Sequence, residues 1–438
     1  MSSAWLGIAA ALCVCFASTR AAAQDAHASA ANESASTSAA NDRAKAPAAG
    51  DESATEPAIV EQRTARASEA FEAQPPVEPT NSTPIAPSAQ ASTRTLWDIV
   101  KILPVFFYSP ETSVGFGAGT LFQFRMPGTK EDSRPSSVSL GAVYTLENQT
   151  VAQLTPDLRF GDDSYVLKLD LLGAKFPNRF YGMGNDPNAD HFDKYTDCYV
   201  RGEADFRVRP FSRDSVLGSL YVGAHYASAW SDISNVRAGS AERPSLFDSI
   251  DDRGERPLFA SGIGPSLAWD SRDGMNWPTR GAFVETKATA FEPWLGSDVR
   301  YRRLVVDARR YQRLWLDHVL AVRAVAQFVW GEVPFQRLPQ LGGSSMFRGW
   351  FTGQLRGPGL MAVEAEYRMP LGPRWAVVAF GSVGKVGDKL RALSPKDLHV
   401  AGGGGVRFSV DKRDRMNIRL DLAYGDSFNP YLQFREAF

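Results

Sequence analysis

Apolar and polar side chains alternate along most of the chain after its first quarter. In one such segment Ile418, Leu420 and Leu422 fall on one face, while Arg419 and Asp421 fall on the other. A period of two residues is that of a β-strand with one apolar face. The pattern predicts an all-β protein, either a soluble sandwich or a transmembrane barrel whose apolar face meets lipid.

Counting these runs predicts an antiparallel barrel of about sixteen strands, an even number that is usual for bacterial barrels and leaves both chain ends in the periplasm. The long segments 175–194, 230–256 and 332–358 are then extracellular loops, and the short turns 161–163 and 210–213 are periplasmic. The predicted strands lie near residues 103–109, 112–127, 134–147, 150–160, 164–174, 195–209, 214–229, 257–270, 280–293, 299–313, 317–331, 359–369, 374–385, 397–411, 415–425 and 428–438.

The beginning of the chain has a different composition. Residues 5–16 are apolar and a run of three alanines follows, which predicts a secretory signal peptide over residues 1–23, with a buried helix as the alternative. Residues 24–95 are rich in Ala, Ser, Thr and Pro and hold one aromatic residue, so they cannot bury enough apolar surface to offset chain entropy. We expect a disordered periplasmic linker there, with a short Ala-rich helix as the alternative, and a barrel domain over residues 96–438.

Charge and the remaining motifs narrow the possible functions. The 48 Lys and Arg residues balance 49 Asp and Glu residues, which argues against nucleic acid as a partner. After the signal peptide no apolar run reaches the roughly 18 residues of a membrane helix, so membrane crossing is expected by strands. The five His residues lack metal-ligand spacing and no Gly-x-Ser-x-Gly elbow occurs, so we expect no metal, cofactor or enzymatic activity. The glycine run 402–405 opens a strand and predicts close strand packing or a bend of the barrel.

Several motifs lie in the second half of the chain. They are the turn residues Asp270, Arg272, Asp273, Pro278 and Gly281, the loop Phe347-Arg348-Gly349-Trp350, the strand residues Glu364, Glu366 and Ser382, and the terminal apolar residues Leu432, Phe434 and Phe438. Together they resemble the bacterial surface antigen superfamily of outer-membrane barrels, the family of BamA, TamA and the two-partner secretion transporters. The resemblance covers roughly residues 104–438 and implies a location in the bacterial outer membrane.

The resemblance also implies that the sixth extracellular loop folds back into the lumen, with Arg348 and Gly349 at its tip. A guanidinium can bridge carboxylates bidentately, and a glycine allows a tight bend. Alternation puts Glu364 and Glu366 on the lumen face, and Glu366 matches the family pattern best as the partner of Arg348. Ser382 stands where the family has an Asp, so it can form a hydrogen bond but supplies no charge. The loop contact either only locks the loop or takes part in function.

Family members that assemble or secrete proteins carry periplasmic POTRA domains, for which residues 24–95 are too short and too polar. The resemblance therefore implies a barrel-only member that assists the insertion or translocation of proteins. The seam between the short first strand, 103–109, and the last strand would be the working element. The expected partners are outer-membrane lipid, a nascent outer-membrane or secreted protein and a separate periplasmic protein. The alternative is a passive pore or structural barrel without assembly activity.

Overall fold

The computed structural model describes residues 100–130, 133–239, 243–250, 256–388, 397–411 and 416–438. The predicted signal peptide and linker, residues 1–23 and 24–95, lie outside these ranges. None of the helices among the described residues is long and apolar enough to cross a membrane.

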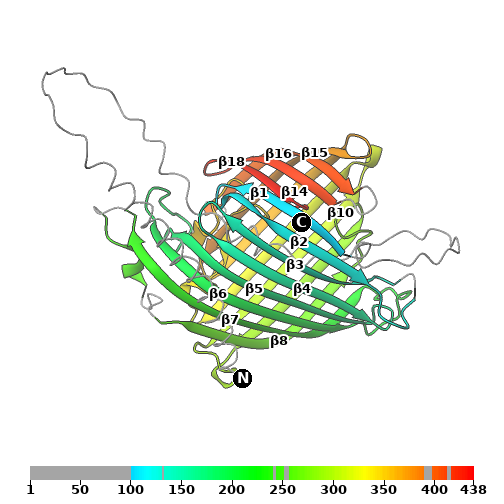
Figure 1. The fold of residues 1–438 in the computed structure, drawn as a ribbon, viewed down its shortest axis with the longest axis horizontal. Coiled ribbons are helices and arrows are strands. Elements are labelled where there is room, and N and C mark those ends of the chain that lie inside the picture. The colour runs from blue at the N-terminus through cyan, green and yellow to red at the C-terminus, as the bar shows by residue number, and fades with distance from the viewer. Residues whose placement is uncertain (1–99, 131–132, 240–242, 251–255, 389–396, 412–415) are drawn as a thin grey trace, which may run out of the picture. The chain divides into compact units, whose positions relative to one another are not determined.

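Sixteen antiparallel strands form a closed barrel, in agreement with the predicted fold class (Figure 1). Each strand pairs with its neighbours in the chain, except that β11 pairs with β14 and β1 pairs with β18. The barrel strands are β1 (Val100–Ser109), β2 (Ser113–Phe124), β3 (Ser136–Thr145), β4 (Thr150–Phe160), β5 (Tyr165–Phe180), β6 (Asp193–Val208), β7 (Leu220–Ala238), β8 (Leu258–Asp270), β9 (Gly281–Phe291), β10 (Tyr301–Arg313), β11 (Val319–Gly331), β14 (Gly359–Pro370), β15 (Trp375–Gly387), β16 (His399–Asp411), β17 (Met416–Tyr424) and β18 (Phe428–Phe434).

The two faces of the barrel wall have opposite character. On β17, Leu420 and Leu422 are each 47% exposed on the outer face, while Arg419 is 3% and Asp421 is 0% exposed on the inner face. A soluble sandwich would bury its apolar face and expose its charges. The apolar outside and polar inside are the arrangement of a transmembrane barrel, so the sandwich alternative is wrong.

Two loops are shorter than predicted because their flanking strands are longer. Strand β7 continues to Ala238 and pairs there with Asp193 of β6, although the segment 230–256 was expected to be a loop. Strand β5 likewise continues to Phe180. The connecting segments are therefore 181–192 and 239–257, and the paired backbone of β5, β6 and β7 extends beyond the neighbouring hairpins.

The last strand ends earlier than predicted. We expected a strand over 428–438, but β18 ends at Phe434, and Arg435 adopts φ 80°. This turn directs the chain into the lumen, where Glu436 Oε2 accepts a hydrogen bond of 2.6 Å from Arg407 Nε and Phe438 is 6% exposed. Phe438 therefore does not join Phe434 on the lipid-facing surface, and its role in a terminal signal stays a prediction.

The same turn explains a weak seam between the first and last strands. Strand β1 pairs with β2 over its whole length, but its register with β18 has the single pair Tyr108↔Leu432. If β18 continued in this register, Glu436 would lie opposite Pro104; instead the chain turns inward at Arg435. The first strand also begins at Val100, so the seam is weak because β18 is short, whereas the sequence had suggested a short first strand.

Candidate functional site

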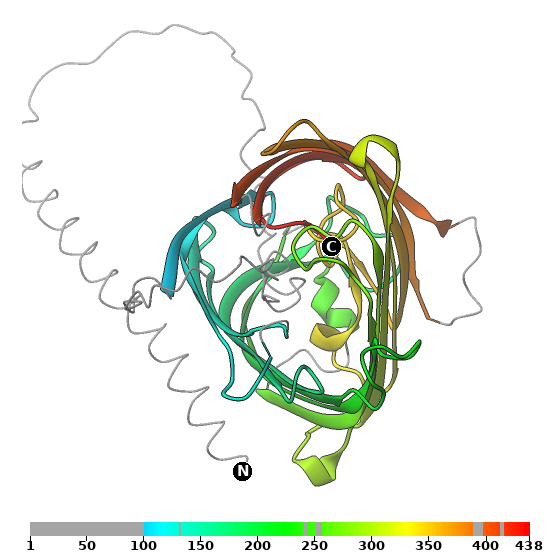
Figure 2. The same ribbon diagram turned by 90° about the vertical axis from the view of Figure 1, so that its right-hand side faces the viewer.

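The segment 332–358, between β11 and β14, folds into the barrel as the resemblance implied. Figure 2 shows it, in yellow, inside the ring of strands. It contains η4 (Phe335–Arg337) and the short antiparallel pair β12 (Gln340–Leu341) and β13 (Leu355–Arg356). We call residues 341–356 the luminal loop.

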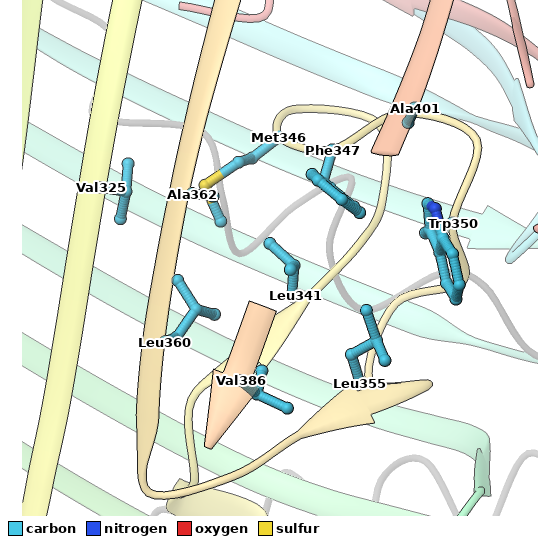
Figure 3. Packing of buried hydrophobic residues seen from close by; sticks show 10 residues of the cluster. All are labelled: Val325, Leu341, Met346, Phe347, Trp350, Leu355, Leu360, Ala362, Val386 and Ala401. Carbon is cyan, nitrogen blue, oxygen red and sulfur yellow. The ribbon is translucent and has the colours of Figure 1, made fainter. Parts of the chain in front are cut away.

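Apolar side chains hold the luminal loop against the wall. Leu341, Phe347 and Leu355 are each 0% exposed and belong to one cluster with Leu360 of β14 and Val386 of β15 (Figure 3). Burying a Leu or Phe side chain stabilises by about 1.5–3 kcal/mol. This apolar anchor offsets the positive φ of 64° at Phe347, a conformation that costs of order 1–3 kcal/mol in a residue other than glycine.

The tip of the loop requires glycine. Gly349 has φ 104°, and a Cβ there would lie 2.7 Å from the carbonyl carbon of Tyr424. The Gly349 N–H donates to the Tyr431 hydroxyl at 3.1 Å, and its carbonyl accepts from Asn429 Nδ2 at 3.0 Å. Trp350 Nε1 donates to the carbonyl of Val400 at 2.9 Å. The backbone of the tip is thus seated directly on β16, β17 and β18.

Arg348 is fully buried at the centre of the site. Its Nη2 lies 2.5 Å from Glu364 Oε1 and 2.9 Å from Glu366 Oε2, and its Nη1 lies 2.7 Å from Asp421 Oδ2. Its Cζ is 3.4 Å from the centroid of the Phe380 ring. Charge-assisted hydrogen bonds and a cation–π contact therefore bind the guanidinium from β14, β15 and β17.

A second layer of arginines binds the same carboxylates. Arg368 Nε is 2.8 Å from Glu366 Oε1, and Arg419 Nη1 is 3.2 Å from Asp421 Oδ2. The cluster pairs four side chains of each charge: the guanidinium groups of Arg348, Arg368, Arg407 and Arg419 face the carboxylates of Glu364, Glu366, Asp421 and Glu436. Arg368 Nη2 also donates to the Phe438 main-chain oxygen at 2.9 Å. A buried ion cluster is tolerated only when its charges and hydrogen bonds are satisfied together.

The structure places both expected carboxylates on Arg348 and adds a third that the sequence did not reveal. Ser382 Oγ donates to Glu364 Oε2 at 3.1 Å, so it positions a carboxylate and supplies no charge of its own. Asp421 of β17 supplies the third negative charge. The only signal for Asp421 was its place on the polar face of a strand, because its approach to Arg348 depends on how the loop enters the barrel.

The glycine run makes space for the side chains of the site. Gly403 and Gly405 both face the lumen. A Cβ at Gly403 would lie 2.8 Å from the Phe380 ring, and a Cβ at Gly405 would overlap Asp421 Oδ1 and lie 2.9 Å from Arg407 Nη1. A side chain at Gly405 would require the ion cluster to shift, and one at Gly403 would require the Phe380 ring and the Leu422 carbonyl to move.

The turn motif between β8 and β9 is held by its two aspartates. Asp270 Oδ1 accepts from Arg272 Nε at 2.9 Å, and Asp270 Oδ2 accepts from Arg134 Nη1, in the β2–β3 turn, at 3.1 Å. Asp273 Oδ1 accepts from the backbone N–H of Thr279 at 2.8 Å. The turn is therefore rigid and is tied to its neighbour.

This turn reaches the same site from the other end of the barrel. Gly281 has φ 99°, where a Cβ would lie 2.9 Å from the Cα of Arg272, and Pro278 is buried. Trp277, directly before Pro278, is 7% exposed and belongs to one apolar cluster with Phe380. The Trp277 ring centroid lies 4.7 Å from Cζ of Arg368, so the turn contacts the second layer of the ion cluster, which the sequence motif did not indicate.

The luminal loop also touches both sides of the seam. Thr352 Oγ1 is 3.2 Å from Glu111 Oε1 in the β1–β2 turn. On the other side, Gln354 Nε2 donates to Asp426 Oδ2 in the β17–β18 turn at 2.9 Å. The two turns that flank the seam are therefore joined through the loop.

Among the residues that the structure describes, no group of three or more His, Cys, Asp or Glu side chains could hold a metal ion. The site is an ion cluster that docks a loop.

Residues 122–421 match the family model described as the Omp85 superfamily domain. CdiB from Escherichia coli has a similar fold, with a TM-score of 0.50, 11% identity, and coverage of 83% of this chain and 68% of that chain. The BamA structure from Haemophilus ducreyi lacking POTRA domains 1–3 gives a TM-score of 0.49 at 13% identity, covering 77% of this chain and 69% of that chain. No curated protein sequence is similar to this one. Because the family match spans more than half of its length, the chain belongs to the Omp85 superfamily.

Proposed function

We propose that this chain is an outer-membrane barrel that assists the insertion or translocation of polypeptides and that the seam between β1 and β18 is its working element. The observation that carries the proposal is that β18 forms the single register pair Tyr108↔Leu432 with β1. With β17, in contrast, it pairs continuously from Ile418↔Phe434 to Tyr424↔Phe428. An unpaired strand edge can accept an extended polypeptide through main-chain hydrogen bonds.

The apolar outer surface and the family membership support the outer membrane as the location. A client polypeptide and a periplasmic protein that delivers it are the partners that this function requires.

The contacts of the luminal loop support a link between the loop and the seam. If β1 parts from β18, the β1–β2 turn with Glu111 moves away from the β17–β18 turn with Asp426. Thr352 and Gln354 of the luminal loop bind these two residues. Each hydrogen bond to a charged group contributes about 1.5–3 kcal/mol. An open seam therefore requires the loop to release at least one side.

A disulfide across the seam tests the proposal. The variant Tyr108→Cys/Leu432→Cys, in a chain whose own cysteines are replaced by serine, joins two directly opposed residues, a geometry within disulfide reach. We expect the oxidised variant to fail to restore the outer-membrane proteome in cells depleted of the protein, and the reduced variant to restore it. Full activity with the seam locked would exclude seam opening.

The matched control is Leu420→Cys/Leu432→Cys. It shares one position with the test pair but joins β17 to β18, which are already paired. This variant should retain activity in both redox states, because the seam stays free.

A passive pore is the second candidate, and the lumen wall opposite the ion cluster favours it. The side chains of Glu203 and Arg303 face the lumen and are each 37% exposed, so water reaches this wall. Recordings in planar bilayers distinguish the two functions. A steady ohmic conductance supports the pore, whereas a mostly closed channel that widens after deletion of residues 341–356 supports a lumen closed by the loop.

A further inference from the structure

A second loop crosses the mouth through which the luminal loop enters. It consists of residues 181–192, between β5 and β6, and we call it the strap. The Gly184 N–H donates to the Arg356 carbonyl at 2.7 Å, and the Arg356 N–H donates back at 3.4 Å. Because Arg356 also pairs with Gln340, the strap adds a third extended segment to the β12–β13 pair of the luminal loop.

Asn185 fastens the strap to the far wall of the barrel. Its Oδ1 accepts from the Val386 N–H at 2.9 Å, and its Nδ2 donates to the Asp397 carbonyl at 2.7 Å. Its carbonyl oxygen lies 2.6 Å from His399 Nε2. Val386 lies near the end of β15 and His399 begins β16, whereas the strap leaves from β5 and β6, which lie across the closed barrel in the strand order.

Aromatic contacts hold the two ends of the strap. Tyr181 is 6% exposed, and its ring centroid lies 4.9 Å from that of Phe351 in the luminal loop. Arg179, at the end of β5, places its Cζ 4.1 Å from the centroid of the Phe192 ring at the end of the strap. The strap is therefore packed on the loop beneath it.

We propose that residues 181–192 act as a latch that must detach from β15 and β16 before the luminal loop can leave the lumen. The loop cannot move outward while Gly184 pairs with Arg356 and Asn185 holds Gly184 in place. The ion cluster around Arg348 and the strap thus restrain the loop from opposite ends. This inference concerns loop movement and does not depend on the proposed role in polypeptide insertion.

Hydrogen exchange measured by mass spectrometry on the refolded barrel tests the latch. Asn185→Leu removes both side-chain hydrogen bonds to the far wall. We expect peptides from 341–356 to exchange roughly 5- to 100-fold faster, as the loss of two hydrogen bonds implies. Asn188→Leu is the matched control, because Asn188 Oδ1 accepts from the Asp190 N–H at 3.0 Å, a bond that stays within the strap. It should leave exchange in 341–356 unchanged.

Two outcomes would overturn the latch. One is unchanged exchange in 341–356 for Asn185→Leu; the other is faster exchange confined to 181–192, which would make the strap an independent loop. A heat-dependent gel shift confirms that each variant is folded. Asn185→Asp provides a second test, since it keeps the acceptor for Val386 and loses the donor to Asp397, and its exchange in 341–356 should be intermediate.

Discussion

Replacing Arg348 with Met should release the luminal loop from the lumen wall. Methionine fills much of the same volume but removes the charge, so three guanidinium groups remain against the four carboxylates of the cluster. Breaking a buried ion pair by removing one partner costs about 3–5 kcal/mol, because the remaining charge stays buried without compensation. At 1.4 kcal/mol per tenfold, the docked loop is destabilised roughly 100- to 4,000-fold.

The assay is hydrogen exchange in residues 341–356 of the folded barrel in detergent. Arg337→Met is the matched control, because Arg337 also lies in segment 332–358 but its charge acts on Asp197 of β6, which is outside the ion cluster around Arg348. We expect the Arg348 variant to exchange at least 100-fold faster in this segment and the Arg337 variant to stay close to the parent.

A charge-compensated variant separates charge from packing. Arg348→Met alone leaves four side-chain carboxylates against three guanidinium groups, and adding Glu364→Gln leaves three against three. The double variant should therefore recover much of the lost protection. A double-mutant cycle measures the coupling directly. Equal exchange in the Arg348 and Arg337 variants would refute the reasoning. Failure of the double variant to recover protection would show that the direct contacts of Arg348, its hydrogen bonds to Glu366 and Asp421 and its contact with the Phe380 ring, hold the loop more than charge balance does.

Two further predictions concern the barrel wall and its turns. Gly405→Ala should lower stability by about 1–3 kcal/mol in denaturant titration, because its Cβ overlaps the Asp421 carboxylate, whereas Gly381→Ala, with no atom closer than 4.0 Å to the new Cβ, should be neutral. The Lys130 N–H donates to the Asp162 carboxylate at 2.8 Å and lowers the Asp162 pKa below its ordinary 3.8. The stabilisation by ionised Asp162 is present above the unfolded pKa of 3.8 and is lost as the pH falls through the lower, folded pKa. The difference in melting temperature between the parent and Asp162→Asn should therefore shrink on acidification.

Much of the fold follows from local pattern. Alternation of side chains is a property of each strand, so it located the strands and assigned Glu364, Glu366 and Asp421 to one face of the wall. The interpretation of the motifs as a family resemblance placed Arg348 at the tip of an inward loop. The loop bounds were less accurate, because strands such as β5 and β7 extend as far as their neighbours pair with them.

The sequence by itself therefore determined a barrel with a polar lumen, its approximate strands and the loop that fills it. The tertiary structure decided which lumen residues meet. Asp421 reaches Arg348, Trp277 lies against Arg368, Asn185 crosses the mouth and the chain turns inward after Phe434. The physical reason is that alternation specifies the face of a residue but not its partner across the lumen, which depends on barrel closure and on the path of each loop.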